Sequence, residues 1–152
     1  MKKYLMLTMI ATITISILSS CKKDGDNTTV KTKTQLLTEK TWKQVKIEQK
    51  VNPADSWTDV TGSYSACDLD NIITFLLAGT FTETEGATKC VSTDPDLASS
   101  GNWSFQSSET ILRLISSGMT NDATIETLDG STLKFSFSNA SVPIYLKITM
   151  QH

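Results

Sequence analysis

The sequence predicts an all-β protein, an eight-stranded antiparallel up-and-down barrel that follows a cleaved signal helix. Three observations carry this prediction. Apolar and polar residues alternate from Trp42 to the C-terminus, which is the period of half-buried strands. Short turns join most of these segments, and Asp129-Gly130 is the strongest hairpin signal among them. No long helical pattern follows residue 20.

Eight segments of the chain carry this alternation, each with one apolar face. Consecutive antiparallel strands must hide these faces together, and a closed barrel does so without leaving a free edge. A two-sheet sandwich is the competing architecture, but it needs strands that cross between sheets, which short hairpins disfavour. The expected strands span residues 42–51, 71–77, 80–85, 101–106, 109–115, 123–128, 132–138 and 142–150.

The first two strands carry specific expectations about which side chains share a face. Val45 and Ile47 are in phase, while Trp42 is out of step with them, which predicts a bulge or bend near Lys43. The second strand is expected to keep its alternation as far as Leu77. Longer loops are expected at residues 52–66 and 86–100, and long loops are often functional.

The first 20 residues have the three parts of a secretory signal. Lys2 and Lys3 form a basic start, residues 4–18 are mostly apolar, and Ser19 and Ser20 place small side chains before a cleavage point. The apolar stretch is shorter than the roughly 20 residues that a transmembrane helix needs. We therefore expect residues 1–20 to be removed from the exported protein.

The sequence Leu18-Ser19-Ser20-Cys21 resembles the bacterial lipobox. The resemblance implies that Cys21 is diacylated on its thiol, becomes the first residue after cleavage, and is acylated on its new amine. Two or more acyl chains anchor a protein stably, so the implied partner is a membrane. An ordinary signal peptide with a cysteine near the cut, or an uncleaved anchor, is the alternative.

The chain then divides into three parts: the signal at 1–20, the lipidated cysteine with a flexible tether at 21–35, and a folded domain at 36–152. The tether has no apolar period with which to bury a face. A short helical turn at residues 36–40 is expected to lead into the barrel. The charged tract Lys22–Asp26 fits both a plain solvated tether and a signal for export to the cell surface. The predicted location is therefore the outer membrane, on either its periplasmic face or the cell surface.

Charge narrows the classes of partner. Without residues 1–20 the chain has 132 residues and a net charge of −4 with His152 neutral. It has no basic stripe with interleaved aromatic residues, so nucleic acid is not an expected partner. The sequence names no protein partner.

Cys67 and Cys90 are the cysteines that remain after Cys21. They flank one predicted hairpin in an exported chain, so a disulfide between them is expected. The alternative is a metal site that uses them with Asp68, Asp70 or His152. Zinc sites show close ligand pairs such as C-x₂-C, which this chain lacks, and we therefore expect no metal and no cofactor.

The residues that catalysis needs are scarce. His152 is the only histidine and the last residue, where fraying is expected. The chain has no G-x-S-x-G nucleophile elbow and no phosphate-binding loop. The sequence predicts that this protein is not an enzyme.

Several short motifs occur along the domain: residues 37–42 with the first strand, Cys67-Asp68-Leu69-Asp70-Asn71, Thr74-Phe75, Ala78-Gly79-Thr80-Phe81, Cys90, Gly101-Asn102-Trp103 and the closing strand from Tyr145 to Met150. Through these motifs, residues 36–152 resemble the lipocalin-like domain found in many small lipoproteins of Bacteroidota. The family usually has a glycine just before the tryptophan of the first strand, whereas here Glu39-Lys40-Thr41 stand there.

The resemblance implies an interior that holds a small apolar or amphipathic ligand. Small eight-stranded barrels can instead be filled by their own side chains, and such a barrel would serve as a structural or interaction module for another envelope protein. The interior aromatic residues fit both hypotheses, as cavity lining or as packed core. They are Trp42, Phe75, Phe81, Trp103, Phe105, Phe135 and Phe137.

Overall fold

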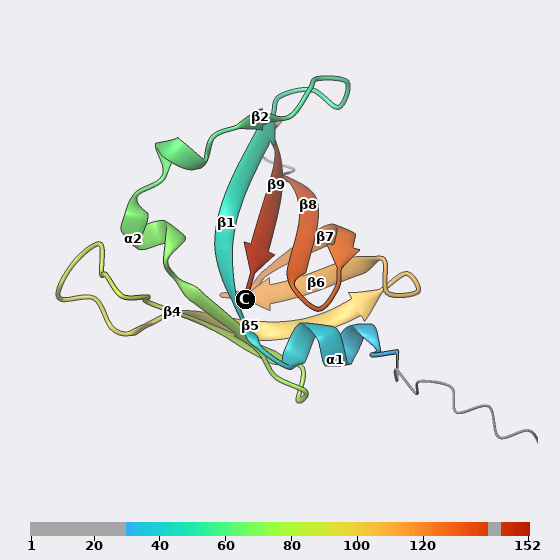
Figure 1. Cartoon of the computed structure of the whole chain (residues 1–152), viewed down its shortest axis with the longest axis horizontal. Coiled ribbons are helices and arrows are strands. Elements are labelled where there is room, and N and C mark those ends of the chain that lie inside the picture. The colour runs from blue at the N-terminus through green and yellow to red at the C-terminus, as the bar shows by residue number, and fades with distance from the viewer. Residues whose placement is uncertain (1–29, 140–143) are drawn as a thin grey trace, which may run out of the picture. The chain divides into compact units, whose positions relative to one another are not determined.

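Nine antiparallel strands form one sheet that closes on itself (Figure 1). The structure is a computed structural model and describes residues 30–139 and 144–152. Within these residues the helical elements are α1 (Lys33–Thr38), the 3₁₀ turn η1 (Thr61–Ser63) and α2 (Ala66–Leu69). The strands are β1 (Thr41–Lys50), β2 (Thr58–Asp59), β3 (Ile72–Phe75), β4 (Thr80–Thr84), β5 (Leu97–Gln106), β6 (Ile111–Ser116), β7 (Met119–Leu128), β8 (Thr132–Asn139) and β9 (Ile144–Gln151).

Eight of these strands make the closed barrel. They follow one another in chain order from β1 through β3 to β9, and β9 pairs with β1 to complete the ring. The remaining strand, β2, is two residues long and pairs only with β1. Each neighbouring pair is antiparallel, which confirms the predicted up-and-down barrel over the sandwich.

Helix α1 begins earlier than the sequence pattern suggested. Thr32 and Gln35 form a capping box, in which the Gln35 backbone N–H donates to Thr32 Oγ1 at 3.2 Å and the Thr32 N–H donates to Gln35 Oε1 at 2.8 Å. This exchange satisfies donors at the start of the helix. The helix therefore starts at Lys33, three residues before the helical turn expected from residue 36.

Strand β1 contains the bulge, but at a different residue. The pairing with β9 shifts register between Gln44 and Lys46, which makes Val45 the extra residue. Val45 is 43% exposed, whereas Trp42 and Ile47 are buried. The prediction that Val45 and Ile47 share a face is wrong, because a bulge moves the inward phase of a strand by one residue.

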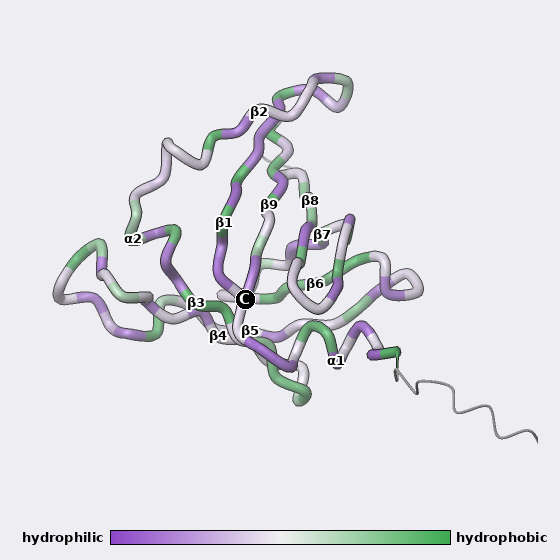
Figure 2. The backbone as a smooth tube through the Cα atoms, in the orientation of Figure 1, coloured by the Kyte–Doolittle hydropathy of each residue, from purple (hydrophilic) through white to green (hydrophobic). Residues whose placement is uncertain are grey.

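The prediction that Leu77 belongs to the second strand is also wrong. Strand β3 ends at Phe75, and the Leu76 N–H donates to Thr80 O at 2.8 Å to close a tight turn. Gly79 allows this turn because it adopts a φ of +79°, which other residues rarely do. Leu77 lies at the tip, 76% exposed, in the apolar turn between β3 and β4 in Figure 2.

Two strands extend beyond their apolar segments. Strand β5 begins at Leu97, four residues before its predicted start, and pairs there with the end of β4. Strand β7 begins at Met119, before its predicted start at Ala123. Both extensions contain polar residues, and ladder hydrogen bonds to the neighbouring strand hold them in place.

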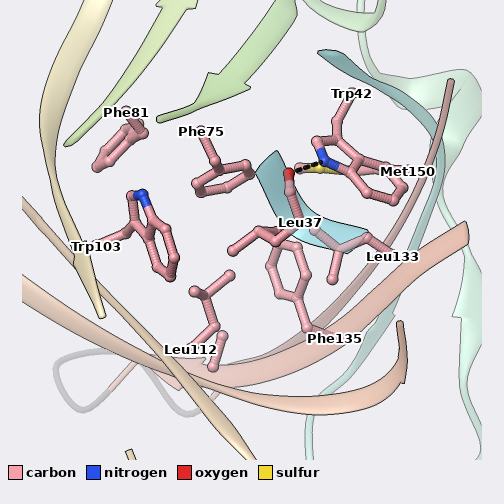
Figure 3. Packing of buried hydrophobic residues seen from close by; sticks show 10 residues of the cluster. Leu37, Trp42, Phe75, Phe81, Trp103, Leu112, Leu133, Phe135 and Met150 are labelled. Atoms are coloured by element: carbon pink, nitrogen blue, oxygen red, sulfur yellow. Dashed lines mark hydrogen bonds between the residues drawn. The ribbon is translucent and has the colours of Figure 1, made fainter. Parts of the chain in front are cut away.

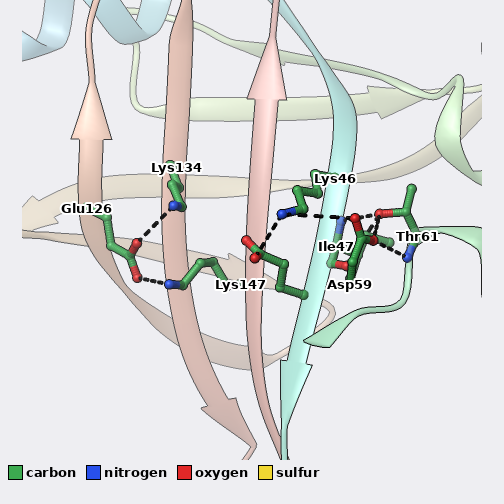
Figure 4. Close-up of polar contacts among 8 residues, drawn as sticks. Lys46, Ile47, Asp59, Thr61, Glu126, Lys134 and Lys147 are labelled. Carbon is green, nitrogen blue, oxygen red and sulfur yellow. Dashed lines mark hydrogen bonds and ion pairs between the residues drawn. The ribbon is translucent and has the colours of Figure 1, made fainter. Parts of the chain in front are cut away.

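The outer face of the barrel carries ion pairs. Glu126 lies 3.2 Å from Lys147 Nζ and 3.6 Å from Lys134 Nζ, across β7, β8 and β9 (Figure 4). Trp57 covers this side, with Lys147 Nζ 4.2 Å from its ring centroid. Lys147 is therefore buried while its charge keeps both an acidic partner and an aromatic face.

The segment around β2 completes the hydrogen bonding of β1. The pairing of β1 with β3 ends at Lys43. Farther along β1, the Ile47 N–H instead donates to Thr61 Oγ1 at 2.9 Å (Figure 4). The Val60 N–H donates to the carbonyl of Ile47 at 2.9 Å. Residues 46–50 of β1 therefore pair with β9 and β2, and the ladder between β1 and β3 is short.

Candidate ligand cavity

Helix α1 closes one end of the barrel. It packs against β3 and β7, and Leu37 enters the interior, where it is fully buried. Figure 3 shows Leu37 at the centre of a cluster of large side chains from several strands. The buried members of this cluster are Leu37, Trp42, Phe75, Phe81, Trp103, Leu112, Ala123, Leu133, Phe135 and Met150.

Two tryptophans are fixed at this closed end by hydrogen bonds. The Trp42 indole N–H donates to Leu37 O at 2.9 Å, and the Trp103 indole N–H donates to Leu76 O at 3.0 Å. Trp103 also makes edge contacts with Phe75 and Phe105, at centroid distances of 6.1 and 5.4 Å. A buried indole needs a partner for its N–H, and here the partners are backbone carbonyls of the helix and of the β3–β4 turn.

The C-terminal residue belongs to the same end. The ring of His152 lies over Trp42 with 3.9 Å between centroids, and its Nδ1 is 2.8 Å from Thr41 O. The expectation that His152 frays is wrong, because β9 pairs with β1 up to Gln151 and brings the last residue onto the indole.

A cavity of about 300 Å³ lies in the barrel interior, toward the end opposite α1. Its deeper wall is apolar and its outer wall carries polar side chains. The lining residues are Gln44, Ile73, Phe75, Phe81, Glu83, Ser99, Leu114, Ser116, Asn121, Ala123, Phe135, Phe137, Ile148 and Met150.

Four of the seven aromatic candidates lie on the cavity wall, and three do not. Phe75, Phe81, Phe135 and Phe137 line the cavity, and Figure 3 shows Phe75, Phe81 and Phe135 directed into the interior. Trp42, Trp103 and Phe105 are not among its lining residues. The two indoles face the closed end because their N–H groups are committed to carbonyls there.

The polar side chains of the cavity were not among the sequence candidates. The signal was present in the alternation itself: Glu83 follows Phe81 by two residues, Ser116 follows Leu114 by two, and Asn121 precedes Ala123 by two. Side chains two apart on a strand share a face. These residues therefore continue the inward phase of their strands beyond the last apolar position.

Register places the polar side chains next to one another on consecutive strands. Glu83 of β4 is opposite Ser99 of β5, and Ser99 Oγ lies 3.3 Å from Ser116 Oγ of β6. Asn121 of β7 is opposite Leu114 of β6. We call Glu83, Ser99, Ser116 and Asn121 the polar arc. The arc spans four adjacent strands on one side of the cavity opening.

The loops beside the opening are joined by a disulfide. Cys67 of α2 and Cys90 of the β4–β5 loop are bonded, with 5.2 Å between their Cα atoms, as predicted. The same two loops meet again where Asp70 Oδ2 accepts from the Thr88 N–H at 3.0 Å and its hydroxyl at 2.7 Å. Gly86 permits this approach, since a Cβ there would lie 2.1 Å from Asp70 O.

This disulfide also bears on the metal alternative. Cys67, Asp68 and Cys90 lie close enough together to resemble a ligand set. Both sulfur atoms are committed to the disulfide and have no thiolate to offer a metal ion. Cys67 and Cys90 are thus positioned to hold loops together rather than to bind metal.

The side chains whose pKa values are shifted are carboxylates and their basic partners on the outside of the fold. A hydrogen bond from Arg113 holds the pKa of Asp122 below its ordinary value, with Arg113 Nε 2.7 Å from Asp122 Oδ1. Backbone N–H groups of Ser131 and Thr132 lower the pKa of Asp129 in the β7–β8 turn. These shifts concern surface pairs and turns, not the cavity.

No protein-family model matches the chain, and no curated protein matches it. Across residues 30–139 and 144–152 the helices are too short and too polar to cross a bilayer. Cys21 and the segment Leu18–Cys21 lie outside the described residues.

Proposed function

We propose that this protein is a lipid-anchored cell-envelope protein whose lipocalin-like barrel binds a small apolar or amphipathic molecule without chemically changing it. The observation that carries the binding proposal is the cavity of about 300 Å³. It is lined by aromatic and aliphatic side chains from several strands, with a few polar groups at one end. This is the usual composition of a small-molecule site.

The size of the cavity favours ligand binding over the alternative of a barrel filled by its own side chains. Protein interiors are close-packed, and voids larger than a water molecule are few. Ligand pockets span roughly 300–1,000 Å³, so this cavity is at the lower end of that range. A barrel filled by its own side chains would not hold an apolar hollow of this size in its interior, whereas a binding protein for one small molecule needs one.

The barrel architecture supports the resemblance to lipocalin-like domains, but it does not identify the ligand. The chain forms a sequential closed barrel with one end closed by a helix and the other lined by loops. Many functions share one fold, so the argument for binding rests on the cavity and not on the barrel.

Titration with N-phenyl-1-naphthylamine, a small neutral fluorophore, tests the binding proposal. We expect a saturable rise in its emission at one molecule per protein. Replacing Ala123 with Phe should abolish this rise, because Ala123 is 2% exposed and lies on the cavity wall, where a ring would occupy the space. Thr124→Phe is the matched control, since it adds the same ring to the opposite face of the same strand.

The result is informative only if both variants fold. Far-ultraviolet circular dichroism and a cooperative urea transition establish that. Loss of probe binding in Ala123→Phe with retention in Thr124→Phe supports the cavity as the site. Equal binding in both variants, or no saturable binding to the wild-type protein, would overturn the proposal.

The anchoring part of the proposal rests on the lipobox-like sequence Leu18-Ser19-Ser20-Cys21 and the basic start before it. In a bacterial host, the Cys21→Ala variant should leave the membrane fraction, since no acyl chain can then be attached. Intact mass spectrometry of the wild-type protein extracted from membranes should show added acyl mass at an N-terminal Cys21. An unmodified chain with a different first residue would contradict this part alone.

A further inference from the structure

We infer that the polar arc at the cavity opening selects ligands whose polar end donates hydrogen bonds and carries no negative charge. This inference rests on the proposed ligand-binding function and specifies the class of ligand. Its predicted ligand has an apolar body with a hydroxyl or ammonium head. A fatty-acid anion is the corresponding disfavoured ligand.

The first observation is the charge of the side chains that line the cavity. Among the described side chains that line the cavity, Glu83 is the one charged residue, and none is a lysine, arginine or histidine. Glu83 is half-buried on the inward face of β4. A carboxylate ligand that enters the cavity would bring a second negative charge near Glu83 without a basic partner, and like charges in a partly dry site repel strongly.

The hydroxyl protons of the arc are the second step. Ser116 donates its single hydroxyl proton to Ser100 O at 2.8 Å. The contact between Ser99 Oγ and Ser116 Oγ at 3.3 Å must then use the proton of Ser99. Both hydroxyl protons are therefore committed within the protein, and Ser99 Oγ presents lone pairs.

The partners of Glu83 are the third step. Asn71 Nδ2 lies 3.5 Å from Glu83 Oε1, a long hydrogen bond that leaves the carboxylate with acceptor capacity. Asn71 Oδ1 is itself buried without a hydrogen-bond partner among the described residues. This side of the opening is therefore rich in acceptors and poor in donors.

The remaining polar groups do not reverse this balance. The amides of Asn121 and Gln44 each offer donors and acceptors in equal measure. Among the described residues that line the cavity, the polar groups are therefore one carboxylate, serine hydroxyls and two amides, with no cation. A ligand head with N–H or O–H groups complements that pattern, and a carboxylate head does not.

Three ligands with the same chain and different heads test the inference: decylamine, decanol and decanoate. Each is used to displace N-phenyl-1-naphthylamine at pH 7 from the wild-type protein. We expect decylamine and decanol to displace the probe at concentrations at least about tenfold lower than decanoate. The order isolates the head group, because the apolar chain is constant.

Glu83→Gln removes the charge with little change of shape. It should narrow the gap between decanoate and decanol by about tenfold and weaken decylamine, with each ligand affinity calculated from the probe affinity measured for that variant. Glu109→Gln is the matched control, since it also removes one negative charge, but from the β5–β6 turn at the α1 end, where Lys33 Nζ contacts Glu109 O. The control should keep the wild-type order.

The possible results distinguish a failure of the head-group selectivity from a failure of the proposed ligand binding. Saturable probe binding with decanoate equal to or better than decylamine, or an unchanged order in Glu83→Gln, would overturn the head-group selectivity and leave the cavity as a binding site. Absence of saturable probe binding would overturn both.

Discussion

The two ends of the barrel interior are built from the same strands but have opposite character. At the α1 end, Leu37 fills the interior and two indoles donate to backbone carbonyls. At the other end, the strands continue with polar inward residues, and the interior holds a cavity. The difference arises within single strands, as in β6, where buried Leu112 is followed by Leu114 and then Ser116.

This contrast shows how one alternating pattern can specify a core and a site together. Strand periodicity decides which residues point inward, and their chemistry decides whether the space is filled. Large apolar side chains at inward positions near α1 give a packed layer, whose burial stabilises the fold. Smaller or polar inward side chains near the opening leave volume and hydrogen-bonding groups. Stability should therefore reside mainly at one end and recognition at the other.

The largest expected effect comes from Trp42→Ala at the closed end. Trp42 is fully buried, contacts His152 and donates to Leu37 O, so its loss leaves a large void beneath α1. We expect the free energy of unfolding in urea to fall by about 3–5 kcal/mol. Trp57→Ala is the matched control, because Trp57 lies on the outer face over Lys147. Equal losses in the two variants would contradict a stability concentrated at the α1 end.

The disulfide is the open end's main cross-link and gives the next largest effect. Cys67 and Cys90 enclose a separation of 23 residues. In the chain-entropy model, the double change Cys67→Ser with Cys90→Ser should lower the free energy of unfolding by about 3 kcal/mol. Urea unfolding of the wild-type protein with and without reductant gives the same comparison. Peptide mapping of the unreduced protein should recover the two cysteine peptides linked, and free thiols in exported protein would contradict the bond.

The sequence predicted strand β8 and the turn before it well, for a physical reason. In β8, Leu133, Phe135 and Phe137 alternate with polar residues, and their inward positions follow directly from that alternation. The Asp129-Gly130 turn is also where predicted, with Asp129 Oδ1 accepting the N–H of Thr132 at 2.8 Å. Local sequence is sufficient where large apolar side chains and a tight turn agree.

The failures occur where tertiary contacts override the local pattern. Val45 alternates with Ile47 in sequence, yet the pairing with β9 makes Val45 a bulge. Leu77 continues the apolar phase of β3, yet Gly79 turns the chain before it can join. Among candidate site residues, aromatic size drew attention to the interior, whereas Glu83 follows the same alternation within its predicted strand. Ser99 lies inward because pairing with β4 starts β5 at Leu97, before its predicted start.

Two leucines on β6 allow the packed end and the cavity end to be compared within one strand. Leu112 is fully buried in the core, while Leu114, two residues on and on the same face, lines the cavity. Leu112→Ala should cost about 2–5 kcal/mol in unfolding free energy, and Leu114→Ala only about 1–2 kcal/mol, because its neighbouring space is already open. Leu114→Ala should instead change the affinity for N-phenyl-1-naphthylamine more than Leu112→Ala does. The reverse pattern in either measurement would mean that the two layers are not distinct.

The smallest expected effect comes from a charged pair on the outer surface of the barrel. It tests whether surface charge affects the stability of the fold or the binding of a ligand. Asp122 on β7 makes a two-point contact with Arg113 on β6, at 2.7 Å for each oxygen. The Arg113 hydrogen bond lowers the pKa of Asp122 below its ordinary value of 3.8 in the folded protein. A lowered folded pKa means that the pair stabilises the fold above pH 3.8 and that this contribution is lost as acid protonates Asp122.

Asp122→Asn should therefore be slightly less stable than the wild-type protein at pH 7, and the difference should shrink as the pH falls through and below 3.8. The effect at pH 7 should be small, because exposed ion pairs contribute little and are screened by salt. Urea unfolding of both proteins across the acid range, at low and high salt, measures it. Binding of N-phenyl-1-naphthylamine should not change, since Asp122 faces away from the interior between Asn121 and Ala123. A stability difference that grew at low pH would mean that Asp122 acts through something other than its pair with Arg113.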